Sequence, residues 1–160
     1  MQLNLGCGSR ILPGYINIDM NNPRADLLHD LRKPLPYPDE SADEILAEHI
    51  IEHFTQTDWE RIQRDWARVL KTEGRIIIHC PDIVRCCDHL VKEKRRWRWL
   101  LPIYGNPAQT PHLNGFDYEK LKASLALVNI EVTDHFYMND RVINPGGFNL
   151  GVIGIKKGNL

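Results

Sequence analysis

Short apolar runs alternate along this chain with segments in which apolar residues recur every three or four positions. Such runs predict strands, at Leu3–Leu5, Tyr15–Asp19, Ala25–Leu28, Ala42–Ala47, Ile76–Cys80, Glu131–Tyr137 and Phe148–Ile155. The run at 76–80 is continuously apolar, as in a parallel strand that is buried on both faces. The last two runs are expected to form an antiparallel pair.

The three-four spacing predicts helices between these strands. The strongest pattern covers residues 57–70, where Thr57 and Glu60 have the spacing of a capping box. Its apolar residues share one helix face: Trp59, Ile62, Trp66 and Val69. A second helix is expected after Asp117, a suitable N-cap residue. Further helices are expected at 48–54 and from residue 83 onward.

The connection after the first strand is short. Only nine residues separate Leu5 from Tyr15, whereas a parallel connection normally needs about 10–12. We therefore expect a stub of helix at 9–12, stopped by Pro13 and Gly14. This predicts thin cover over one face of the sheet, and apolar surface there would favour a homodimer.

Composition indicates one globular domain spanning residues 1–160, with 42% hydrophobic and 26% charged residues. Lys and Arg total 20 against 21 for Asp and Glu, so bulk charge argues neither for nor against a polyanionic partner. No apolar run reaches the ~18 residues of a membrane span, and we expect a cytoplasmic protein. The four cysteines form no CxxC pair, which favours buried thiols over a disulfide framework or a zinc site.

The segment LNLGCGS, residues 3–9, carries the first chemical signal. Gly6 and Gly8 remove side chains where the first strand ends, so the backbone can turn and lie against a ligand. Asp19 ends the next strand, where its carboxylate can accept hydrogen bonds from a ribose. A dinucleotide-binding turn is disfavoured, because Ile11 occupies the third glycine position and Asp19 follows Gly6 by thirteen residues rather than ~20.

Three segments together resemble the class I S-adenosylmethionine-dependent methyltransferases, in particular the compact type 11-like group that begins NLGCGS. They are LNLGCGS, HDLRKPLPYPDESADEILAEHIIEHF (29–54) and RVLKTEGRIIIHCPD (68–82). The alternation of strands and helices predicts an α/β three-layer, Rossmann-like, doubly wound sheet. The resemblance adds about seven strands, mostly parallel with an antiparallel last strand. This chain would lack the N-terminal helix of many relatives and have a shortened first crossover.

The resemblance implies that S-adenosylmethionine is the cofactor and which residues bind it. Gly6 and Gly8 match the glycine loop, and Asp19 matches the acid that binds the ribose. Arg10 replaces a third glycine, and we expect that it can pair with the carboxylate of the cofactor. The full expected set is Asn4, Gly6, Cys7, Gly8, Asp19, Asp30, Leu31 and Glu48, with Asp30 and Leu31 at the adenine edge and Glu48 near the sulfonium.

Methyl transfer needs an aligned nucleophile and, for a hydroxyl, a base that removes its proton. The topology directs His49 and Asp82 toward the pocket, and His112 lies in a long Pro- and Gly-rich loop. We therefore expect His49, Asp82 and His112 to be the candidate catalytic residues. The loop from Pro102 to Gly115 is expected to form a lid or a wall over the substrate.

The letters HxxEH at His49, Glu52 and His53 formally match a zinc-hydrolase signature. Two histidines four residues apart would share a helix face. The same letters occur in the resembling methyltransferases with no metal implied, so we expect no metal at this motif.

The acceptor is expected to be a small molecule or a saccharide. A methyltransferase-like binding or regulatory protein without turnover is the alternative. Methylation of RNA or protein is less favoured, although the basic run Lys92–Trp99 mixes five basic side chains with two tryptophans that can stack on bases. DNA-base methylation is disfavoured, because no NPPY-type segment follows the fourth strand.

Overall fold

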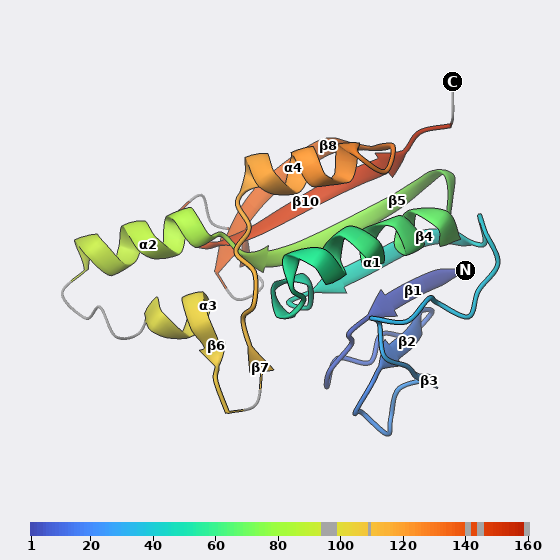
Figure 1. Ribbon diagram of the computed structural model, residues 1–160, viewed down its shortest axis with the longest axis horizontal. Coiled ribbons are helices and arrows are strands. Elements are labelled where there is room, and N and C mark those ends of the chain that lie inside the picture. Colours follow the sequence, from blue (N-terminus) through green and yellow to red (C-terminus); the bar gives the residue numbers. More distant parts are fainter. Residues whose placement is uncertain (94–98, 109, 140–141, 144–145, 159–160) are drawn as a thin grey trace.

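The computed structural model describes residues 1–93, 99–108, 110–139, 142–143 and 146–158. Their main feature is a mixed sheet of eight strands in the order β3-β2-β1-β4-β5-β10-β8-β9 (Figure 1). The strands are β1 (Gln2–Leu5), β2 (Ile16–Asp19), β3 (Leu27–Leu28), β4 (Ala42–Glu48), β5 (Leu70–Pro81), β8 (Ile130–Asn139), β9 (Val142–Ile143) and β10 (Asn149–Lys156).

The strand directions confirm the expected fold class. Strands β1 to β5 pair in parallel, and β10 lies antiparallel between β5 and β8. The two-residue β9 adds to the seven expected strands at the edge beside β8. The strand order reverses next to β1, where a doubly wound sheet binds its ligands beyond the carboxyl ends of the strands.

Helices α1 (Gln56–Val69) and α4 (Tyr118–Ala126) pack on one face of the sheet (Figure 1). The apolar stripe of α1 buries Trp59 and Trp66 almost completely. Its N-cap is Thr55, which accepts a hydrogen bond from the backbone N–H of Asp58, so the helix begins earlier than the expected cap at Thr57. Asp117 caps α4 as expected, by accepting from the backbone N–H of Lys120.

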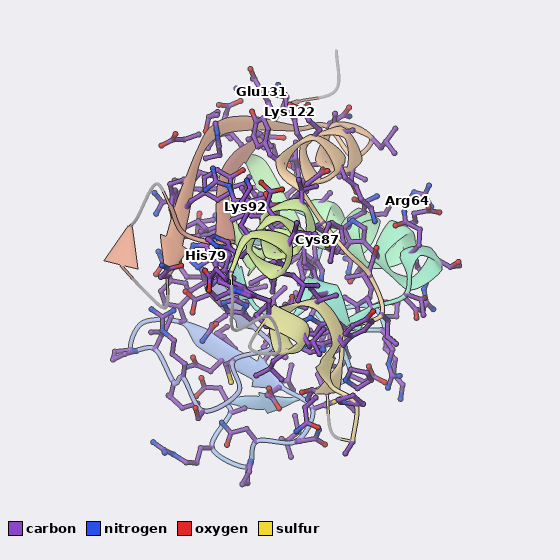
Figure 2. The ribbon with its side chains drawn as sticks, turned by 90° about the vertical axis from the view of Figure 1, so that its left-hand side faces the viewer. Arg64, His79, Cys87, Lys92, Lys122 and Glu131 are labelled. Atoms are coloured by element: carbon purple, nitrogen blue, oxygen red, sulfur yellow. The ribbon has the colours of Figure 1, made fainter. Side chains whose placement is uncertain are left out.

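Helices α2 (Ile83–Lys92) and α3 (Leu100–Tyr104) lie beyond the carboxyl ends of the strands, which is the end seen in Figure 2. The expected Pro102–Gly115 loop contains a small hairpin of β6 (Gly105–Asn106) and β7 (Thr110–Pro111). Much of the basic run, residues 94–98, lies outside the described residues. Trp99 is buried, and its ring stacks on His89 and meets Phe148 edge-on. This tryptophan therefore packs in the protein interior.

Two helix predictions are wrong. Residues 9–12 form an irregular loop rather than a stub of helix. The Asn17 side chain bonds both the backbone N–H and the carbonyl of Leu12, which satisfies these groups without helical hydrogen bonds. Residues 48–54 contain only a single 3-10 turn, η1 (Ile51–His53). Cys7, Cys80 and Cys86 are buried, as expected, whereas Cys87 is exposed.

The loop at 6–15 covers the face of the sheet opposite α1 and α4, in place of the helices that a third layer would supply. Polar groups fill this interface. Asn4 bonds Asn17 at 2.9 Å, Tyr15 and Arg75 both contact Glu44, and Arg10 pairs with Glu48. The expected thin cover is therefore present, but over β1 and β4 the interface beneath it is largely polar.

The homodimer stays a prediction, as does the cytoplasmic location. No described helix is long and apolar enough to cross a membrane.

His79 on β5, labelled in Figure 2, completes this polar layer. Its Nδ1 lies 2.9 Å from Glu48 Oε1, while its Nε2 is buried without a partner. A neutral ring satisfies this arrangement, because a protonated ring would bury a second N–H with no acceptor. Burial, together with the charges of His49 and Arg10, lowers the pKa of His79 from 6.5 to about 4.

We predict that His79 makes the protein less stable in mild acid. Because the folded pKa lies below the unfolded value of 6.5, its contribution is complete above pH 6.5 and is lost as the pH falls toward 4. The loss amounts to about 3 kcal/mol. Urea unfolding at several pH values should show that the free energy of unfolding falls less between pH 6.5 and 4 in His79→Gln than in the wild type. His135→Gln, at an exposed position, serves as the control, and parallel curves for wild type and His79→Gln would refute the prediction.

Candidate active site

The backbone bends sharply between β1 and the covering loop. Gly6 has a φ of +67° and Gly8 a φ of +50°, both in the left-handed region that favours glycine. A Cβ on Gly6 would lie 2.6 Å from Cγ1 of Ile50, whereas one on Gly8 would have no atom within 4 Å. The N–H groups of Gly6 and Cys7 both donate to the Ile18 carbonyl, which fastens the bend to β2. Gly8 thus presents bare backbone to open space.

Asp19, at the carboxyl end of β2, faces this bend. Its Oδ2 accepts a hydrogen bond from the Gly8 N–H at 2.9 Å, and its Oδ1 accepts from the N–H groups of Asn21 and Asn22. A carboxylate has about four lone-pair sites, so this one keeps acceptor capacity for a ligand hydroxyl. The three backbone donors hold the carboxylate in place.

The segment after β3 supplies a second carboxylate. Asp30 accepts hydrogen bonds from the Arg32 guanidinium through both oxygens, at 2.9 to 3.2 Å. These bonds lower the pKa of Asp30 to about 2, so the group stays ionised. The Leu31 side chain between them is buried. The His29 N–H bonds the Asp19 carbonyl and keeps this segment next to β2.

A cavity of about 530 Å³, here called the first cavity, joins these groups. The structure brings together five of the expected cofactor residues in its lining: Gly6, Gly8, Asp19, Asp30 and Leu31. It also adds residues that the sequence did not reveal, among them Asn21, His29, Phe54 and Leu113. Asn21 lies two residues after Asp19, and His29 directly precedes Asp30. This closeness in the sequence was the only signal for these two residues.

Three other expected cofactor residues lie outside the described lining of this cavity: Asn4, Cys7 and Glu48. Asn4 and Glu48 belong to the polar layer on the opposite face, since alternate side chains of a strand point to opposite sides. The thiol of Cys7 is buried, and this burial raises its pKa. Arg10 pairs with Glu48 in that layer, so the expectation that it meets the cofactor carboxylate is not supported.

His49 lies directly after β4 with a φ of +50°, a left-handed conformation that is rare for a residue with a side chain. Its ring lines the first cavity and also a second cavity of about 520 Å³. Its Nδ1 lies 3.3 Å from Oε1 of the buried Glu52. His53 and Thr110 line both cavities as well, so the two spaces meet at these side chains.

The other two catalytic candidates differ in position. His112, from the hairpin end, lines the second cavity, and burial lowers its pKa from the ordinary value. Asp82 is not part of the described lining of either cavity. It caps α2 by accepting from the Arg85 N–H, and it accepts from the Tyr137 hydroxyl at 3.2 Å. The structure therefore gives Asp82 a structural task.

S-adenosylmethionine fits the first cavity. The volume lies in the usual range of small-ligand sites, about 300–1,000 Å³. Gly8 allows close backbone approach, and Asp19 offers acceptors to ribose hydroxyls. Asp30 and the backbone of Leu31 lie across the same space, where an adenine edge needs polar partners. These residues would hold the cofactor.

Comparison with known proteins agrees with this geometry. Residues 3–78 match the family model described as "Methyltransferase domain". Among proteins with curated functions, none matches the sequence.

Three solved structures illustrate the likeness of fold. A S-adenosylmethionine-dependent methyltransferase from Methanosarcina mazei has 17% identity and a TM-score of 0.69, over 98% of this chain and 92% of that one. The 1,6-didemethyltoxoflavin-N1-methyltransferase of Burkholderia thailandensis was solved with S-adenosylhomocysteine. It has 14% identity and a TM-score of 0.69, over 98% of this chain and 71% of that one. A Haloferax volcanii methyltransferase in complex with an activator has 12% identity and a TM-score of 0.67, over 99% of this chain and 82% of that one.

We predict that the two glycines of the bend respond differently to alanine. Gly8→Ala should cost about 1–2 kcal/mol, the penalty of a left-handed residue with a Cβ. Gly6→Ala should cost about 1–3 kcal/mol more, because its Cβ overlaps Ile50. Urea unfolding of the single variants, repeated in an Ile50→Ala background, checks this. Only the Gly6→Ala penalty should shrink in that background, and equal penalties in both backgrounds would contradict the overlap.

Proposed function

We propose that this chain, whose residues 3–78 match the methyltransferase-domain family model, uses S-adenosylmethionine to methylate a hydroxyl group of a small, saccharide-type molecule held in the second cavity. The observation that carries this proposal is the junction of the two cavities at His49. A methyl donor in the first cavity and an acceptor in the second would meet there.

The second cavity suits a hydroxylated ligand. Its volume of about 520 Å³ fits a small molecule better than a polymer. Asn149 lines it with the side-chain Oδ1 buried and without a partner. Such a group costs free energy until a ligand hydroxyl donates to it. Phe148 adds an aromatic ring next to this amide, and Asn106 adds a second amide on the hairpin.

The bound cofactor supplies a methyl group on a positively charged sulfur. With the cofactor bound, the acceptor oxygen would bond to the methyl carbon as the carbon–sulfur bond breaks, which would leave S-adenosylhomocysteine. The acceptor proton must leave in the same process. We assign its removal to Nε2 of His49, because Glu52 Oε1 can accept from the Nδ1–H and so hold that tautomer.

The left-handed backbone of His49 supports this role. A residue with a Cβ adopts such a φ only where its surroundings impose it, and such residues gather at active sites. The His49 N–H donates to the His79 carbonyl at 2.8 Å, which holds the conformation in place. His112 lines the same cavity, but its Nδ1 bonds the backbone carbonyl of Pro102 in α3. It is therefore a wall residue in this proposal rather than the base.

A binding or regulatory protein without turnover remains the alternative from another class. It would keep the first cavity and bind the cofactor, so cofactor affinity does not separate the two functions. Release of S-adenosylhomocysteine does separate them. RNA and protein acceptors belong in the same assay as further arms.

We predict that Asp19→Asn weakens binding of S-adenosylhomocysteine about 10- to 100-fold. The reason is the loss of charge-assisted bonds to the ribose, worth about 1.5–3 kcal/mol. Isothermal titration calorimetry measures the change. Asp88→Asn, at an exposed acid of α2, is the matched control and should bind like the wild type. If Asp19→Asn bound S-adenosylhomocysteine with unchanged affinity, the proposal that Asp19 binds the ribose would be wrong.

We predict that His49→Ala lowers turnover about 10²- to 10⁴-fold with little change in cofactor affinity, as expected for loss of a general base. Transfer of a labelled methyl group to a panel of saccharides, other small hydroxylated molecules, an RNA and a protein mixture provides the assay. His135→Ala is the control. Turnover of wild type with none of these acceptors would favour the regulatory alternative, and equal turnover of wild type and His49→Ala would exclude His49 as the base.

A further inference from the structure

Three potential metal ligands converge where the two cavities meet. Glu52 and His53 come from η1, and His112 comes from the segment after β7. One ligand atom of each lies within 4.8 Å of those of the other two. The rings of His53 and His112 meet edge-on with centroids 5.0 Å apart. The fold therefore builds a different set from the HxxEH pair, because η1 is a 3-10 turn and not a helix that would align His49 with His53.

In both imidazoles a hydrogen bond at Nδ1 leaves Nε2 as the nitrogen that can coordinate a metal. Nδ1 of His53 lies 3.0 Å from the Pro111 carbonyl, and Nδ1 of His112 lies 3.0 Å from the Pro102 carbonyl. A carbonyl only accepts, so each Nδ1 carries the proton and each Nε2 keeps its lone pair. Metal-binding histidines commonly bond through the other ring nitrogen in this way, which fixes both tautomer and ring direction.

Glu52 provides the independent sign that a ligand is needed. Its side chain is only 3% exposed, and its Oε2 is buried without a hydrogen-bond partner. Within the described residues that line the second cavity, none is a lysine or an arginine. A buried carboxylate oxygen without a donor or a cation is costly. A bound cation would satisfy this oxygen, while Oε1 keeps its contact with His49.

The hairpin is built so that His112 can come close. A Cβ on Gly105 would lie 2.6 Å from Cδ2 of the His112 ring and 2.3 Å from the Thr110 carbonyl. Only glycine leaves room for the ring at this point. The backbone N–H groups of Leu113 and Asn114 donate to the Glu52 carbonyl, which ties the hairpin segment to η1.

We propose that Glu52, His53 and His112 bind one divalent zinc ion. Two imidazoles and one carboxylate are a known ligand set of catalytic zinc sites, in which a further position stays open. Bonds of about 2.0–2.2 Å require the three side chains to close by small rotations around the ion. Both histidines and Glu52 line the second cavity, from which a further ligand could reach the ion.

The role of this ion rests on the proposed function. An acceptor hydroxyl that binds at the open position would become more acidic, because a zinc ion lowers the pKa of a bound oxygen ligand. The proton would then pass to His49, which contacts Glu52. The zinc site would thus orient the acceptor and prepare it for methyl transfer, and the ion itself would undergo no redox change.

Direct binding tests the site without any use of activity. Protein freed of metal by a chelator should bind one equivalent of Zn²⁺ in calorimetry, and Co²⁺ should give the visible absorption of a low-coordinate site. Mg²⁺, which prefers oxygen ligands, should bind weakly. His53→Gln, His112→Gln and Glu52→Gln should each weaken Zn²⁺ binding about 100-fold or more, since loss of an outer partner alone costs 10- to 100-fold. His135→Gln is the control.

The outcomes separate this inference from the proposed function. Absence of stoichiometric Zn²⁺ binding, or binding that the three substitutions leave unchanged in variants with wild-type circular dichroism, overturns the zinc site. Binding of S-adenosylhomocysteine by the same metal-free protein would leave the methyltransferase function standing in that case. Zn²⁺ binding with no methyl transfer to any acceptor would instead support the ion and reject its role with the acceptor.

Discussion

The connection between β1 and β2, residues 6–15, constrains the rest of this structure. Parallel neighbours normally require a helical crossover, but these residues are too few to build one. The chain turns at two left-handed glycines and then lies as a loop over the sheet. The turn creates the bare backbone beside Asp19, and the loop replaces a helical layer. One short connection thus determines both the cofactor site and the character of the opposite face.

That face shows the consequence in its side chains. A helical layer would bury apolar residues of β4 and β5. Here Glu44, Glu48 and His79 occupy those positions. Glu44 bonds Tyr15 and Arg75, and Glu48 contacts Arg10 and His79. A loop has polar backbone groups that need partners, and polar strand residues can provide them. This solution buries ionisable groups, among them His79, whose pKa is lowered to about 4 chiefly by burial.

The opposite end of the sheet combines two cavities with a hairpin from a distant part of the chain. His49 and Glu52 follow β4, whereas His112 and Thr110 come some sixty residues later. The hairpin segment bonds the Glu52 carbonyl and brings its histidine beside His53. Chemistry proposed for the acceptor therefore depends on a contact between η1 and the hairpin, not on the sheet itself. This separates the proposed cofactor site, beside β1 to β3, from the proposed acceptor site.

The sequence alone determined the seven strands β1 to β5, β8 and β10, the faces of α1 and α4, and the glycine bend with Asp19. These features depend on local periodicity, on residue conformational preference and on the reach of a short connection, all of which can be read from neighbouring letters. It did not determine the start of α1, because Thr55 and Thr57 are both capable caps and packing selected one. Only the tertiary structure decided that Glu48 and Arg10 pair with each other outside the described lining of the first cavity, that Asp82 caps a helix, and that His112 meets His53. Those outcomes rest on side-chain directions and on contacts between segments far apart in the chain, which no local pattern encodes.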